Sequence, residues 1–112
     1  MATTTVSFDL DGTTNTVDTD YTLYTVPNNN DATVDVIFCN RQASTATALK
    51  LQVVPNGETA GDEHYIEFAK ALAAKVSYSV TGLTLGEGDS LVFSGSVAST
   101  SILVTGNYNP ET

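Results

Sequence analysis

Apolar and polar residues alternate along most of this chain, in short segments separated by turn residues. The clearest case is the stretch from Thr33 to Arg41, in which Val34, Val36 and Phe38 occupy every second position. Successive side chains of a β-strand point to opposite faces, so the pattern predicts strands with one buried face and one face in water. After residue 20 the predicted strands span residues 21–26, 33–40, 47–54, 64–69, 76–83, 90–95 and 100–106.

Turn-forming residues lie between the predicted strands. Asn28 to Asp31, Pro55 to Gly57 and Gly86 to Asp89 contain mainly Asn, Asp, Gly and Pro, which favour turns. Short strands at this spacing, with turns between them, are typical of an antiparallel sandwich or barrel. The sequence therefore predicts an all-β protein, an antiparallel β-sandwich of about 7–8 strands, for which a jelly roll is one candidate form.

The expected core consists of apolar residues that share strand faces. Its predicted members are Val34, Val36, Phe38, Leu51, Val53, Val80, Leu91 and Phe93. One stretch has a second interpretation: the alanine-rich segment from Glu67 to Lys75 would also suit a short helical connector of about two turns.

The first twenty residues differ from the rest of the chain. They are rich in threonine and contain a single apolar alternation, Val6, Phe8 and Leu10, followed by a turn signal at Asp11-Gly12. We expect an N-terminal arm with one short strand over residues 1–20 and a β-sandwich domain over residues 21–112. A chain of 112 residues is long enough for one such domain.

Charge and composition exclude several classes of function. The chain has 13 acidic and 4 basic residues, for a net charge of −9, which argues against nucleic acid as a partner because phosphate binding needs clustered Lys and Arg. No stretch approaches the roughly 20 apolar residues that span a bilayer, and the first residues lack the features of a signal peptide. We therefore expect a product of the cytoplasm with no membrane partner. The single cysteine, Cys39, is predicted to be a small buried hydrophobe.

One short motif resembles an enzyme signature. The run from Val6 to Thr14 is similar to the first motif of haloacid-dehalogenase-type phosphatases, whose two aspartates would fall at Asp9 and Asp11 and whose chemistry uses Mg²⁺. That chemistry also needs a parallel sheet, and parallel strands need long, usually helical crossovers that this sequence lacks. We interpret the motif as a strand that ends in an Asp-Gly turn, and we expect no catalysis from either aspartate.

The remaining candidate chemistry favours structural roles. His64 is the only histidine and has no nucleophile in a suitable context, so we predict that it lies at the surface where a strand begins. One Cys and one His are too few for a zinc site, and the oxygen-rich turn at Asn28 to Asp31 does not have the spacing of an EF-hand loop. We expect no catalytic, cofactor-binding or metal-binding residues.

Four segments taken together resemble a pattern of small all-β virion proteins of tailed bacteriophages. They are Thr22–Pro27, Phe38–Arg41, His64–Phe68 and Thr81–Leu91. The group includes head decoration (cement) proteins and tail-associated β-sandwich modules, and the resemblance covers residues 21–105. It implies a non-enzymatic structural protein of the virion that is made in the host cytoplasm and needs no cofactor.

The resemblance also implies partners. A decoration protein binds the outside of the capsid, often as a trimer, and stabilises contacts between capsomers. The expected partners are other copies of the chain, with a trimer favoured, and the major capsid protein or another virion protein. Val6, Phe8 and Leu10 of the arm are the expected partner interface, through addition of a strand to a neighbour's sheet. Two alternatives stay open: the arm could pair with its own sandwich, and the protein could be a tail, baseplate or fibre module with a host-binding role.

Overall fold

Strands make up most of residues 2–110, the part of the chain that the computed structural model describes. The elements are β1 (Ala2–Leu10), β2 (Tyr21–Thr25), β3 (Asn30–Asn40), β4 (Thr47–Val54), the 3₁₀ helix η1 (Asp62–His64), β5 (Tyr65–Leu72), β6 (Ser77–Leu85), β7 (Ser90–Gly95) and β8 (Thr100–Pro110).

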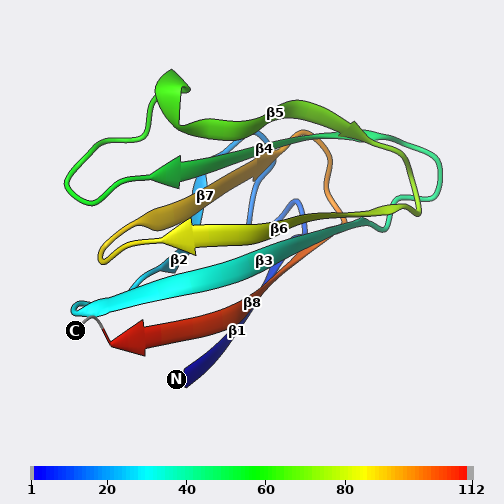
Figure 1. Cartoon of the computed structure of the whole chain (residues 1–112). Helices are drawn as coiled ribbons and strands as arrows, with labels where there is room; N and C mark the ends of the chain where they lie inside the picture. Colours follow the sequence, from blue (N-terminus) through cyan, green and yellow to red (C-terminus); the bar gives the residue numbers. More distant parts are fainter. Residues whose placement is uncertain (1, 111–112) are drawn as a thin grey trace.

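The strands form two four-stranded antiparallel sheets that pack face to face (Figure 1). Sheet A has the order β1-β8-β3-β6, and sheet B has the order β2-β7-β4-β5. The first strand pairs with the last, the second with the seventh, the third with the sixth and the fourth with the fifth. This is the pairing of a long hairpin rolled up into a sandwich, which is the topology of a jelly roll. The predicted all-β sandwich is confirmed.

Strand β5 settles the one ambiguous stretch. Pairs from Thr47 with Leu72 to Gln52 with Tyr65 join β5 to β4, with two shifts of register, and Leu72 is buried between the sheets. The helical interpretation of Glu67 to Lys75 is therefore wrong. Alanine has the highest intrinsic helix propensity, but propensity is a weak preference that pairing and burial override.

The strand of the predicted N-terminal arm belongs to the sandwich. β1 pairs with β8 along its whole length, from Ala2 opposite Tyr108 to Leu10 opposite Thr100. Leu10 is fully buried, and Phe8 packs against the core. The expected boundary at residue 20 thus cuts through the structure, because β8 supplies backbone partners and the core supplies cover for the apolar side chains of β1. Residues 11–20 connect the strand to β2.

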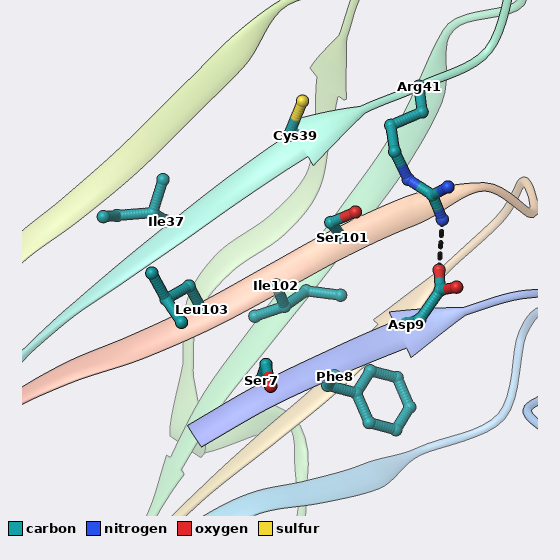
Figure 2. Close-up of a pocket in the computed structure, with 9 residues that line it drawn as sticks. All are labelled: Ser7, Phe8, Asp9, Ile37, Cys39, Arg41, Ser101, Ile102 and Leu103. Carbon is teal, nitrogen blue, oxygen red and sulfur yellow. Dashed lines mark hydrogen bonds and ion pairs between the residues drawn. The ribbon is translucent and has the colours of Figure 1, made fainter. Parts of the chain in front are cut away.

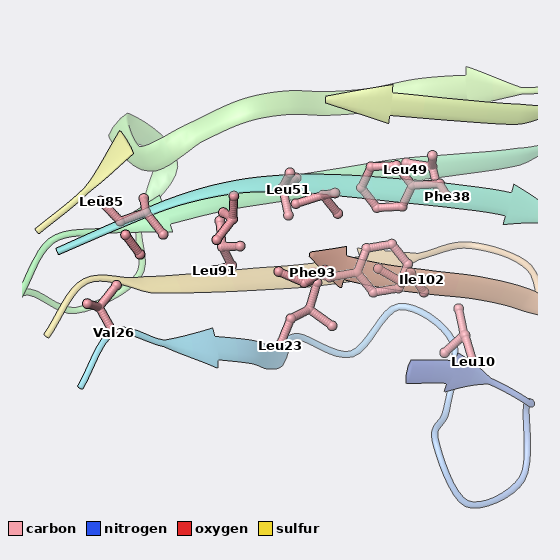
Figure 3. Close-up of a cluster of buried hydrophobic side chains, with 14 of the residues drawn as sticks. Leu10, Leu23, Val26, Phe38, Leu49, Leu51, Leu85, Leu91, Phe93 and Ile102 are labelled. Carbon is pink, nitrogen blue, oxygen red and sulfur yellow. The ribbon is translucent and has the colours of Figure 1, made fainter. Parts of the chain in front are cut away.

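The core lies between the two sheets (Figure 3). Six of the eight predicted core residues are buried, and Val53 and Val80 are partly buried against them. Five aromatic rings cross the sandwich in a row in which each ring contacts the next, with centroid distances from 5.1 to 6.4 Å. In order they are Tyr78, Phe38, Phe93, Phe8 and Tyr21.

Candidate functional site

A shallow hollow of about 490 Å³ lies on the outer face of sheet A, across β1, β8 and β3 (Figure 2). Ser7, Leu103 and Ile37 are directly opposite one another on the three strands. The next outward row is Asp9, Ser101 and Cys39. Ile37 and Leu103 thus lie side by side at one end of the hollow, and Ile37 is 38% exposed; Phe8 and Ile102 also line it.

An ion pair closes one end of this hollow. The Arg41 guanidinium, just after β3, donates a hydrogen bond to the Asp9 carboxylate on β1 (Figure 2). Both side chains are about half exposed, at 45% and 55%, so solvent screens the pair and it adds little to stability. The ion pair places two charged side chains at this end of the hollow, next to its apolar residues.

The side chains that line the hollow are mainly small polar groups and aliphatic residues. Its lining residues include serine hydroxyls and the free thiol of Cys39, but no histidine, and the one carboxylate among them is paired with arginine. A serine or cysteine nucleophile is usually activated by an adjacent base, and the only carboxylate lining the hollow is the one paired with Arg41. Exposed apolar side chains beside polar and charged groups are compatible with a protein–protein contact.

Cys39 does not lie where the sequence suggested. It was predicted to be buried, but it is only partly buried and faces the hollow. Phe38 and Asn40, its neighbours on β3, are fully buried, and strand alternation therefore directs Cys39 to the outer face.

The phosphatase-like motif has two separate structural uses. Asp9 binds Arg41, whereas Asp11 accepts hydrogen bonds from the backbone N–H groups of Thr13 (2.8 Å) and Asn15 (3.0 Å) in the turn after β1. These bonds, that from Thr13 above all, lower the pKa of the Asp11 carboxyl below its ordinary value. The sheets are antiparallel, so the framework of that phosphatase chemistry is missing from residues 2–110. That neither aspartate is catalytic stays a prediction.

His64 is buried, which corrects the prediction of a surface histidine. Its side chain is 7% exposed, and Nε2 lies 3.4 Å from Glu58 Oε1 and 3.8 Å from Glu63 Oε1. The reason is η1, which contacts β4 and carries His64 inward while Glu58 and Glu63 remain exposed. Apolar periodicity could not show this, because the helix is a single turn within a polar loop.

A second outward surface, which sequence reasoning missed, lies along β5. We call it the β5 surface and define it by Tyr65, Ile66, Phe68 and Lys50. Phe68 is 64% exposed and Ile66 is 42% exposed. The Phe68 ring packs edge-on against Tyr65, with centroids 4.9 Å apart, and Lys50 Nζ lies 4.9 Å from the Phe68 centroid. The alternation of Ile66 and Phe68 was visible in the sequence, but it does not tell a buried face from an exposed one.

The three residues expected to contact a partner have intramolecular uses. Leu10 is fully buried, and Val6 and Phe8 are partly buried against the core. Leu10 therefore offers no side-chain surface to a partner, whereas Val6 and Phe8 keep part of theirs exposed, and Phe8 lines the hollow on sheet A. β1 is nevertheless an edge strand of sheet A, since β8 is its only paired neighbour among the strands of residues 2–110. A role for Val6, Phe8 and Leu10 in binding a partner stays a prediction.

Comparisons with known proteins add no family. No protein-family model matches the chain, and no curated protein shows significant similarity to it. Within residues 2–110, no three His, Cys, Asp or Glu residues are grouped so that they could hold a metal ion. No helix of the described part is long and apolar enough to cross a membrane.

Proposed function

We propose that this protein is a non-enzymatic structural component of a bacteriophage virion, a decoration protein that binds the outer capsid and stabilises contacts between capsomers. The virion assignment comes from the resemblance of its four sequence segments. The observation that carries the binding role is the hollow on sheet A, where the apolar pair Ile37 and Leu103 lies beside serine hydroxyls and the Arg41–Asp9 ion pair. The charge of −9 is compatible with an outer surface that meets no DNA.

The jelly roll suits this role because the outer face of each sheet is built on paired strands. Sheet A is held by pairing of β8 with both β1 and β3, so the hollow is built on strands rather than on loops. Binding that occurs only on the assembled shell stabilises that shell by mass action. Several copies bound together strengthen weak individual contacts.

The test uses particles of the parent phage that lack the protein. Purified wild-type protein should sediment with these particles and raise the temperature at which they release their genome. Ile37→Asp, which places a charge in the apolar pair, should weaken binding by about tenfold or more, equivalent to about 1.4 kcal/mol. Thr33→Asp puts the same charge on the same face of β3 outside the hollow and should bind normally. Absence of wild-type binding to the particles would refute the decoration role.

The β5 surface favours a second candidate, a tail, baseplate or fibre module with a host-binding role. Tyr65 and Phe68 present aromatic surface on an exposed edge, and host receptors often include sugars that stack on such rings. An electron-microscopy map of the parent particle would place the protein on the head or on the tail. Tail density together with loss of host binding in Phe68→Ala would select this alternative.

A further inference from the structure

Exposed apolar side chains concentrate on one edge of the sandwich. Among the described residues, the large hydrophobic side chains that are exposed are Ile37, Ile66, Phe68 and Val76. Two of these lie on β5, and Val76 lies in its connection to β6. β5 is also an edge strand of sheet B, since β4 is its only paired neighbour in the described part of the chain. The β5 edge therefore offers both apolar cover and unpaired backbone to another chain.

Charge is distributed unevenly along the same edge. Lys50, Lys70 and Lys75 lie on or beside β5, while the fourth basic residue of the chain, Arg41, is paired with Asp9. Lys70 and Lys75 mark the end of the strand. The acids Asp62 and Glu63 lie at its start, in η1, and both are exposed. Figure 1 shows η1 and the connection to β6 at opposite ends of β5. On an acidic protein, this edge is acidic at one end and basic at the other.

The order of these charges is self-complementary. Asp62 and Lys75 are equally far in sequence from the midpoint between Phe68 and Ala69, and so are Glu67 and Lys70. When two copies of β5 run antiparallel about that midpoint, Asp62 of each copy faces Lys75 of the other. Glu67 and Lys70 also come to lie opposite each other, but within each chain both already contact Tyr78, Glu67 by a hydrogen bond and Lys70 over the ring, so the Asp62–Lys75 pairs carry the charge complementarity. Each pairing occurs twice, as a twofold contact requires.

We propose that a second copy of this chain docks on the β5 edge in this antiparallel register. Phe68 then lies beside Ala69 of the other copy, and Ile66 lies beside Ala71, so that each large side chain meets a small one. The register shifts twice between β5 and β4, and Ala69 has a φ of 53°, so the strand is bulged and cannot offer a long regular ladder. The side chains therefore carry most of the contact, and short backbone pairing adds to it.

The proposed contact does not depend on the virion role, and its twofold symmetry differs from the threefold symmetry expected of a decoration protein. A twofold contact gives a dimer, whereas the resemblance to decoration proteins favours a trimer. The measurement is sedimentation equilibrium of the full isolated protein from about 1 μM to about 1 mM. The wild type should form dimers that weaken with added salt, because exposed charge pairs are screened.

Charge reversal gives a specific test of the register. Neither Asp62 nor Lys75 has a side-chain ion pair with another described residue, so changing them should leave the monomer intact. Asp62→Lys and Lys75→Glu should each weaken the dimer by about tenfold, and the double variant should restore most of the affinity because the pair is rebuilt with opposite sign. Phe68→Ser should also weaken the dimer, while Ile37→Ser, which removes an exposed apolar group from sheet A, should leave it unchanged.

Other outcomes would overturn the proposal. A monomer across the whole concentration range would do so, and so would a trimer. A dimer that is unaffected by the single charge reversals, or that is lost in Ile37→Ser, would place the contact elsewhere. Failure of the double variant to restore association, with its fold intact by circular dichroism, would refute the antiparallel register.

Discussion

Truncation of Phe38 is the most direct test of the core. Its side chain has no exposed surface and lies within the aromatic row, between Phe93 (5.7 Å between centroids) and Tyr78 (6.4 Å). Phe38→Ala removes the ring and leaves a cavity between two sheets whose strands are fixed by pairing. Buried Phe to Ala substitutions cost about 3–5 kcal/mol, and we expect this one to fall in that range.

The cost is large relative to the stability of the whole domain, which for a protein of this kind is about 5–15 kcal/mol. Phe38→Leu therefore serves as a second variant: it keeps most of the volume, and its cost should be clearly smaller than that of alanine. The Phe38–Phe93 pair should show a coupling of about 0.5–1.5 kcal/mol in a double-mutant cycle, the usual range for aromatic pairs.

The assay is urea unfolding at 25 °C followed by far-UV circular dichroism, with the free energy of unfolding extrapolated to water. Phe68→Ala is the matched control, since it is the same substitution at a ring that is 64% exposed, and it should change stability by no more than about 0.5 kcal/mol. The reasoning fails if Phe38→Ala costs less than about 1 kcal/mol, or if the two substitutions cost the same.

Two further predictions concern ionisation. Asp11 has a lowered pKa because backbone N–H groups bind its carboxylate, so its stabilising contribution is present above the unfolded pKa near 3.8 and is lost as the pH falls through the lower folded value. Asp11→Ala should thus be less stable than the wild type at pH 7, with a difference that shrinks in acid unfolding experiments; a constant difference would contradict this. The Tyr78 hydroxyl donates a 3.0 Å hydrogen bond to Glu67, and this bond raises the pKa of Tyr78. The stability that the bond adds is therefore present below about pH 10 and is lost as the pH rises through the raised pKa. Glu67→Gln should lower the pKa of Tyr78 in an NMR titration while leaving Tyr24, whose pKa is raised mainly by burial, unchanged.

Local periodicity was enough to find the strands and most of the core. In β3, the apolar residues Val34, Val36 and Phe38 occupy every second position, and all three are buried as that pattern predicts. The same strand also contains an apolar residue whose position periodicity does not predict. Ile37 is also apolar, yet it lies on the outer face, because a strand in a surface sheet can carry a hydrophobic residue on either side.

Long-range pairing was not accessible from the sequence. Val6, Phe8 and Leu10 formed a convincing strand, but its partner, β8, lies at the other end of the chain. Nothing in a local pattern distinguishes pairing with that strand from pairing with another molecule. For the same reason, sequence reasoning could place a strand over part of β5 without showing that it is an edge with exposed Phe68.

The four edges of the sandwich differ in how they avoid unwanted pairing, and this difference bears on where a partner binds. β2 is only five residues long and is bulged, and β6 is broken by a bulge where the Gly82 N–H donates to Asp35 Oδ1 at 2.9 Å. The outward side chains of β1 are Thr, Ser and Asp, which keep that edge polar. β5 is bulged as well, but it also exposes Ile66 and Phe68. This edge is therefore less well protected against pairing with another chain than the other three. The bulges of β5 prevent a long hydrogen-bonded ladder with another chain, while its apolar side chains and matched charges still offer a contact. This combination favours a short, specific contact, as a closed twofold dimer requires, over open-ended aggregation.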